Sequence, residues 1–278
     1  MMRSALADTA PRARALTFAY PDDFDLAWSG AVPEFACAAN SVSLMMPYVE
    51  PYVAQSVRAA IDRIDDPLLR ARAQGYVRQE LAHHAQHRRF NQLVAAQCRG
   101  VDRIERWMRI AYRRLAARKD LGSHLAFAAG SEAFAYAAAR WTAEHRREVL
   151  GTAEPAIAEL FVWHLAEEVE HKTVAFDVFQ AVDGSRRRYV WGVFLSFVLL
   201  ASFTVLGTTL QLWRRHRLFH PVAIARLVRW TITFLFELLP ALVVSALPGH
   251  SPHDLADPAF FVQWLREHDA AGGVGTAD

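Results

Sequence analysis

Apolar residues recur at intervals of three and four between residues 37 and 181, which is the repeat of one face of an α-helix. Alanine and leucine are abundant there, and no β-branched run bounded by glycine indicates a strand. Asp66 before Pro67 is a typical helix start, because a carboxylate caps the first turn and proline fits its first position. We therefore predict an all-α fold, with long helices over Pro47–Ile64, Asp66–Cys98, Asp102–Ala117, Asp120–Arg147 and Pro155–Val182.

The pattern changes at Arg186, where a long apolar stretch begins. The 25 positions from Tyr189 to Trp213 contain no charged residue, enough to cross the ~30 Å hydrocarbon core of a bilayer. Arginines flank both ends and tryptophans lie near them, which is typical of a membrane anchor. A second apolar stretch, Trp230–Leu247, follows a connector with five arginines between residues 214 and 229.

Positive residues resist translocation across a bilayer, so the arginine-rich connector disfavours a fully spanning hairpin. We expect a shallow or re-entrant, membrane-associated hairpin on the cytoplasmic side. Two buried helices of a larger helical protein are the alternative.

Composition narrows the class of protein. The chain is 53% hydrophobic, which excludes disorder, and its formal charge of +2 gives no basic field for binding nucleic acid. Cys37 and Cys98 form no CxxC motif, which excludes a disulfide scaffold and a thiolate zinc site. We divide the chain into an irregular N-terminal arm (1–30) without chemistry of its own, a helical bundle (31–185), and an apolar hairpin with a tail (186–278).

Two of the predicted helices each carry a Glu-x-x-His pair. Glu80 and His83 lie on the second helix with His87 on the same stripe, because three and seven steps of 100° return to nearly the same face. By the same arithmetic the last helix, Pro155–Val182, groups three further residues: His164, Glu168 and His171.

Two Glu-x-x-His helices are half of the ligand pattern of di-iron carboxylate four-helix bundles, and one glutamate from each remaining helix is the other half. Glu132 is the only acidic residue between Leu121 and Ala143. Glu50 precedes Pro51 and is expected in or just before the first turn of its helix. The sequence therefore predicts a ferritin-like four-helix metal-binding bundle with additional helices and a C-terminal apolar hairpin.

The predicted ligands of two metal ions are Glu50, Glu80, His83, His87, Glu132, His164, Glu168 and His171. A single Glu-x-x-His pair usually lies on a solvated helix face. The prediction of a metal site therefore depends on two such pairs together with Glu50 and Glu132. Two divalent cations would balance four buried carboxylates, and the mixed ligands favour iron, with manganese or zinc as alternatives. His87 is either a ligand or a hydrogen-bond donor to one. Glu167 and His87 are also candidate general bases.

The motifs Gln79-Glu80-x-x-His83-x-x-x-His87 and His164-x-x-x-Glu168-x-x-His171-Lys172, with the following Val174-Ala175-Phe176-Asp177, resemble the predicted metal-dependent hydrolase family of bacteria over about residues 16–269. The second motif is also similar to that of the aminoarene N-oxygenases, ferritin-like di-iron enzymes with an additional histidine ligand. The chain departs from related sequences at Val49 and Ala133, where they usually have glycine and histidine.

These residues lead us to expect a non-haem di-iron oxygenase or oxidoreductase that activates dioxygen, with an electron donor and a small, lipophilic substrate that enters from the membrane. The alternative is a metal-dependent hydrolase that uses a metal-activated bridging water. Metal storage is disfavoured, because this many ligands on one site make a reactive centre. The sequence is also compatible with a homodimer.

Overall fold

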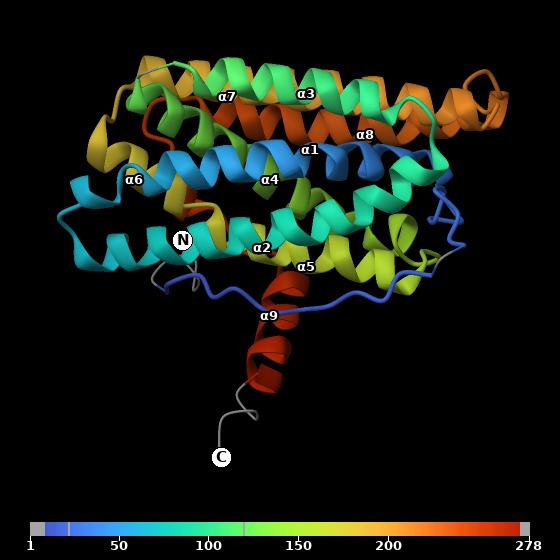
Figure 1. Ribbon diagram of the computed structural model, residues 1–278. Helices are drawn as coiled ribbons and strands as arrows, with labels where there is room; N and C mark the ends of the chain where they lie inside the picture. The colour runs from blue at the N-terminus through green and yellow to red at the C-terminus, as the bar shows by residue number, and fades with distance from the viewer. Residues whose placement is uncertain (1–8, 22, 119, 273–278) are drawn as a thin grey trace.

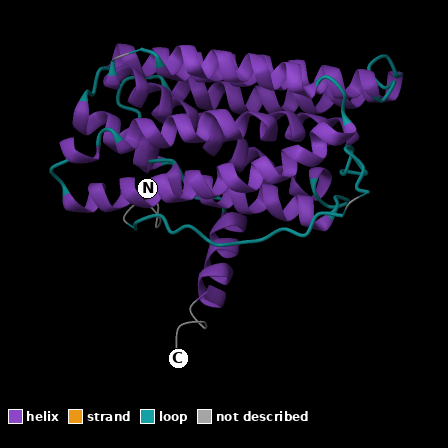
Figure 2. Cartoon of the chain, in the orientation of Figure 1, coloured by secondary structure: helices purple, strands orange, loops and turns teal. Residues whose placement is uncertain are grey.

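The computed structural model describes residues 9–21, 23–118 and 120–272, and within these ranges it contains helices and no strand (Figures 1 and 2). The prediction of an all-α fold is thus confirmed. The helices are α1 (Pro33–Arg58), α2 (Pro67–Gln97), α3 (Val101–Ala116), α4 (Leu121–Val149), α5 (Pro155–His171), α6 (Val174–Val182), α7 (Arg186–Arg214), α8 (Pro221–Ser245) and α9 (Ala259–Gly272).

Helix α1 begins at Pro33, so the predicted start at Pro47 is wrong, and Glu50 lies well inside the helix. Proline has no N–H, so Pro47 cannot donate to the carbonyl of Ser43 four residues earlier. That carbonyl instead accepts a 2.8 Å hydrogen bond from Nδ2 of Asn91 in α2. A neighbouring helix therefore satisfies the backbone group that Pro47 leaves unpaired, and α1 continues through it.

The helix predicted over Pro155–Val182 is two helices, because α5 ends at His171 and α6 begins at Val174. Side chains from elsewhere hold the residues between them. Lys172 donates a 2.6 Å hydrogen bond to the carbonyl of Leu255, and Arg72 of α2 donates to the hydroxyl of Thr173. These long-range contacts stabilise a break that the local sequence does not announce.

Helix α7 lies lengthwise along the bundle and packs on α1 and α4 (Figure 1). Glycines allow its backbone to approach the helices beneath. A Cβ atom on Gly192 would lie 2.2 Å from the carbonyl oxygen of Ala126 in α4, and one on Gly207 would lie 2.6 Å from the hydroxyl of Ser41 in α1. Near the far end of α7, Gln211 donates a 2.9 Å hydrogen bond to the carbonyl of Cys37. The hairpin is therefore anchored on the bundle along its length.

Helices α7 and α8 are long and apolar enough to cross a membrane, by length and composition. In their most apolar 18-residue windows, only 28% and 11% of the residues are buried. The alternative that both are buried helices is thus wrong, because the bundle covers one side of the hairpin and leaves the other side exposed.

The N-terminal arm runs along α2 and α5 on the face opposite α7 (Figure 1). Its described residues, 9–21 and 23–32, contain no helix, yet the side chains of Phe18, Phe24 and Trp28 are no more than 5% exposed. These rings pack into the same hydrophobic cluster as Trp163 of α5 and Phe90 of α2. The arm is therefore part of the core.

Candidate metal centre

The structure brings all eight predicted ligands into one buried cluster. Each is no more than 9% exposed: Glu50 of α1, Glu80, His83 and His87 of α2, Glu132 of α4, and His164, Glu168 and His171 of α5. The order of contributing helices is that of the four-helix carboxylate pattern. Whether this is a ferritin-like bundle in its finer topology stays a prediction.

The cluster contains two overlapping positions for a cation. Around the first, one ligand atom from each of four residues lies within 4.8 Å of the others: Glu80, Glu132, Glu168 and His171. Three groups, whose ligand atoms lie within the same distance of one another, surround the second position. They are Glu50 with Glu80 and His83, His83 with His164 and Glu168, and Glu50 with His87 and His164. Glu80 and Glu168 belong to both positions, so their carboxylates lie between the two.

Several buried polar atoms of the cluster have no hydrogen-bond partner in the part of the chain that the structure describes. They are both carboxylate oxygens of Glu50, Oε2 of Glu132, and Nδ1 of His83 and of His171. Burial raises the pKa of Glu50 and of Glu132 well above the ordinary value, and repulsion by Glu80 and Glu168 adds to it, more than the nearby histidines offset. Two divalent cations would supply both the missing charge and the missing partners, so the residues present fit a pair of metal ions.

The hydrogen bonds of Gln79 fix which nitrogen of His171 faces the cluster. The Gln79 amide nitrogen donates to the Arg12 carbonyl (3.1 Å) and to Glu170 (2.7 Å), so its oxygen is the atom 2.7 Å from Nε2 of His171. His171 must donate to that oxygen from Nε2. Its Nδ1 therefore faces the cluster, 3.0 Å from Oε1 of Glu80, and offers a lone pair to a metal ion once the ring is neutral.

His83 is oriented in the same way by Glu167. Oε2 of Glu167 lies 3.0 Å from Nε2 of His83, while Oε1 accepts 3.1 Å hydrogen bonds from the backbone N–H and the guanidinium of Arg14. A carboxylate can only accept, so Nε2 of His83 donates and Nδ1 faces the cluster. Burial opposes the charge on Glu167, but the hydrogen bond and charge of His83, together with the charges of Arg14 and His171, outweigh it and lower the pKa of this carboxyl.

Arg14 is the residue that the sequence interpretation missed, because the arm was expected to have no chemistry. It is only 7% exposed, and its guanidinium also contacts Glu170 at 2.9 Å. A signal for it exists in α5, where Glu167, Glu168 and Glu170 fall within four positions and only Glu168 is a predicted ligand. Two further buried carboxylates require a buried cation.

His87 is held by a chain of hydrogen bonds that begins at the carbonyl freed by Pro47. Asn91 donates to that carbonyl through Nδ2, so Oδ1 of Asn91 accepts the hydroxyl hydrogen of Ser43 at 2.7 Å. The Ser43 oxygen lies 2.8 Å from Nδ1 of His87 and has no second hydrogen to give. His87 therefore donates from Nδ1, and its Nε2 lone pair faces the cluster.

A serine-to-alanine change tests this orientation. Ser43→Ala removes the acceptor of the His87 Nδ1–H, and we expect the affinity for metal to fall about 10–100-fold, as is typical when a partner of a ligand is lost. Ser56→Ala is the matched control, because this serine is also buried in α1 but bonds only to the carbonyl of Tyr52. Equal metal affinities of the two variants, measured by competition with a chromogenic chelator, would show that His87 does not help to hold metal.

His164 adds an argument for a cation between α2 and α5. Its Nδ1 lies 2.7 Å from Nε2 of His87, and its Nε2 lies 3.1 Å from Oε1 of Glu168. Both neighbours are acceptors, whereas a neutral imidazole has one N–H. Burial lowers the pKa of His164 and so disfavours the doubly protonated ring. A bound cation removes the conflict, because a ring nitrogen can bind it through the lone pair.

The pKa of His83 predicts that metal binding releases a proton. Burial opposes its charged form, but the nearby carboxylates of Glu167 and Glu168 together outweigh burial and raise the pKa to about 10. His83 is therefore protonated in the metal-free protein at neutral pH, and a metal ion on Nδ1 displaces that proton. Apparent affinity should rise by up to about tenfold per pH unit between pH 7 and the pKa of about 10, where the gain ends. Calorimetry in buffers of different ionisation enthalpy measures the proton released; an affinity that is flat from about pH 7 to 9 would contradict the assignment of His83.

A cavity of about 100 Å³ adjoins the cluster. The carboxylates Glu50, Glu80, Glu132 and Glu168 line it together with apolar and small side chains of α1, α4 and α7, among them Met46, Phe127, Phe134, Ala138 and Leu200. A reacting group in the cavity would therefore meet the cluster on one side and an apolar wall on the others.

The family described as predicted metal-dependent hydrolase matches residues 12–256 of the chain. Searches of the curated proteins and of the solved structures give no match.

This match overturns the leading functional expectation. The interpretation as a dioxygen-activating oxygenase or oxidoreductase is wrong, because the description of the family is that of a hydrolase. The physical reason is that histidines and carboxylates show that metal ions can be held, and the same ligands serve both reaction classes. The electron donor expected for an oxygenase is no longer required, whereas the metal dependence and the hydrolase alternative agree with the match.

Proposed function

Because the chain belongs to the family of predicted metal-dependent hydrolases, we propose that it hydrolyses a small, lipophilic substrate at a centre of two divalent metal ions. The observation that supports this proposal is the single buried cluster in which Glu80 and Glu168 belong to both cation positions. Two ions in such a site lower the pKa of a water between them and polarise the scissile group. Zinc, manganese and iron all suit mixed imidazole and carboxylate ligands.

The residues around the cluster orient its ligands and hold protons. Glu167 positions His83, since both of its oxygens are engaged by His83 and Arg14. This geometry makes Glu167 a positioning residue in the proposal and leaves His87 as the candidate base. Ser43 holds Nδ1–H of His87, so Nε2 can take a proton from the cluster side or bind an ion there.

The cavity supports a substrate with an apolar group next to the scissile bond. Leu200 and Ser196 of α7 line the cavity, while the opposite side of the same helix exposes Phe194 and Val198. The apolar hairpin thus lies between the cavity and the surface that we propose faces the membrane. Since α7 packs along its length on α1 and α4, we propose that the hairpin lies in the cytoplasmic membrane surface without spanning it.

Reloading metal-free protein tests this function. Full-length protein in detergent is stripped with a chelator, reloaded with zinc or manganese, and assayed with the p-nitrophenyl esters of butyrate and of succinate. We expect turnover only after reloading, unaffected by the removal of dioxygen, and faster for butyrate, because the cavity wall is apolar. Protein that binds two metal ions per chain and hydrolyses neither these esters nor amide or phosphoester analogues would refute the proposal.

A further inference from the structure

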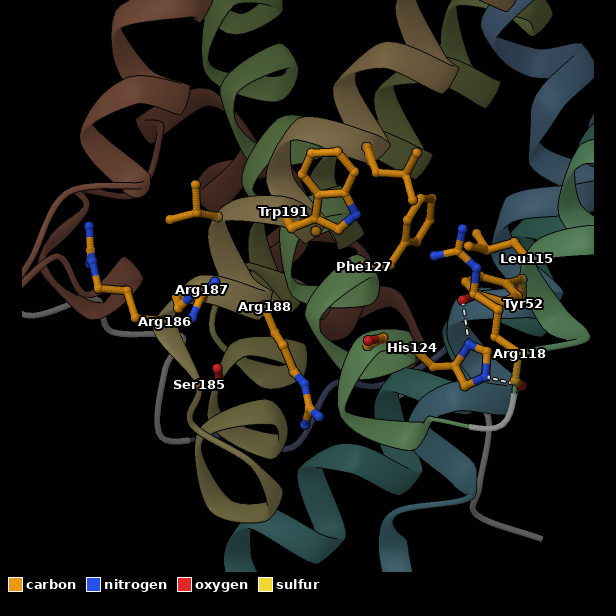
Figure 3. Close-up of a pocket in the computed structure, with 14 residues that line it drawn as sticks. Tyr52, Leu115, Arg118, His124, Phe127, Ser185, Arg186, Arg187, Arg188 and Trp191 are labelled. Atoms are coloured by element: carbon orange, nitrogen blue, oxygen red, sulfur yellow. Dashed lines mark hydrogen bonds between the residues drawn. The ribbon is translucent and has the colours of Figure 1, made fainter.

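A second, larger cavity lies outside the metal centre, where α3 ends and α4 and α7 begin (Figure 3). Its volume is about 750 Å³, within the range of small-molecule pockets. Arg118 and His124 line it on one side and the run Arg186–Arg188 on another, with Trp191 beside them (Figure 3). Phe127 lines both this pocket and the cavity at the metal cluster, and its buried ring separates the two.

The pocket has an excess of positive charge. Arg188 is paired with Asp183 and Asp120, and Arg186 donates to the carbonyl of Ala246. The guanidinium groups of Arg118 and Arg187 have neither an ion pair nor a hydrogen bond within the ranges that the structure describes. Two arginines that face one cavity without a counter-charge fit an anion, and guanidinium matches the geometry of phosphate.

The other wall of the pocket is apolar and continuous with the exposed side of the hairpin. Val190 and Trp191 line the pocket and are 39% and 58% exposed. Exposed apolar side chains continue along α7 at Phe194, Val198 and Val205. A ligand that fills the pocket therefore meets arginines on two of its sides and an apolar track that leads away from Trp191.

We propose that this pocket binds the phosphate headgroup of an anionic membrane lipid, whose acyl chains lie along α7. A free phosphate ion would contact the arginines alone and leave the wall at Trp191 without a partner. A lipid satisfies both, and arginines beside a membrane-associated helix are attracted to anionic lipids. The site requires no catalysis, so it stands independently of the hydrolase proposal.

The test compares how the full-length protein partitions into two kinds of vesicle, phosphatidylcholine alone and phosphatidylcholine mixed with phosphatidylglycerol. The double variant Arg118→Gln/Arg187→Gln removes the two unpaired charges. A diffuse surface attraction costs about fivefold for each arginine lost, wherever it lies near the membrane. Arg226→Gln is the control, because this arginine lies in the hairpin helix α8 and does not line the pocket.

We expect the wild-type protein to prefer the anionic vesicles, the double variant to lose more than the roughly 25-fold that two diffuse charges would cost, and Arg226→Gln to lose no more than about fivefold. Glycerol 3-phosphate, the soluble headgroup, should compete only weakly because it lacks the acyl chains. The proposal is overturned if the wild type shows no preference, or if Arg226→Gln loses as much for each charge as the double variant. Full competition by glycerol 3-phosphate would instead show a site for a soluble phosphate ester and would overturn the lipid assignment.

Discussion

Glu168→Gln is expected to remove at least one metal ion per chain and to reduce hydrolysis by more than the ~10–100-fold that the loss of a ligand's partner causes. Glu168 lies between both cation positions and contacts three histidines: Nε2 of His164 at 3.1 Å, Nδ1 of His83 at 3.5 Å and Nδ1 of His171 at 3.7 Å. Glutamine keeps the shape of the side chain and removes its charge, so the helices should remain folded. Elemental analysis and circular dichroism measure the two effects separately.

The matched control is Glu159→Gln, nine residues earlier on the same helix, where the side chain is 45% exposed and contacts only His268. This variant should keep both metal ions and full activity. If Glu168→Gln also retains two metal ions, then Glu168 is not a ligand shared by the two positions, and that assignment is wrong.

Arg14→Ala is expected to lower the free energy of unfolding by about 3–5 kcal/mol, because it leaves the buried carboxylates of Glu167 and Glu170 without their cation. The further contact with Asp269 adds little, since that carboxylate is 45% exposed and solvent screens it. Without Arg14, the carboxylate of Glu167 is no longer held in place as the partner of His83. We therefore expect the affinity for metal to fall together with the stability. Chemical denaturation of the metal-free and metal-loaded protein measures both.

Arg12→Ala controls for the arm itself. Arg12 lies two residues before Arg14 and its side chain is exposed. It contacts the site through its backbone carbonyl, which accepts a hydrogen bond from Gln79. Alanine keeps that carbonyl, so we expect a change below about 0.5 kcal/mol. Equal losses in the two variants would mean that the arm contributes by packing alone and that the buried ion pair does not matter.

The ligand cluster could be predicted because its geometry is mostly local. The spacing from Glu80 to His83, and from Glu168 to His171, fixes each pair on one face of a helix before any tertiary contact forms. Glu132 is the only acid in the apolar stretch between Leu121 and Ala143 of α4, and such a carboxylate is buried only with a partner. Glu50 joins the cluster although its place within α1 was predicted wrongly, since the periodicity downstream of Pro47 is the same in either case.

What could not be predicted depends on contacts between distant parts of the chain. The start of α1 depends on Asn91, which satisfies the carbonyl that Pro47 leaves free. The role of the arm depends on Arg14 meeting a glutamate 153 residues away, and an irregular segment has no periodicity to reveal such a contact. The reaction class could not be predicted for a different reason. One set of metal ligands supports several reaction classes, and here the family match distinguishes between them.

The arm that contacts the metal centre is synthesised before the helices on which it packs. Arg14 must wait for Glu167, 153 residues later, which at about 5–20 residues per second takes roughly 8–30 s. Its contact with Asp269 requires a further hundred residues, by which time α7 and α8 have been synthesised. Glu167 precedes the last predicted ligand, His171, by four residues in the same helix, so the ion pair of Arg14 and the full ligand set become available at nearly the same time. Arg14 is thus a residue that must remain without its buried counter-charges until the last helix of the ligand cluster is made.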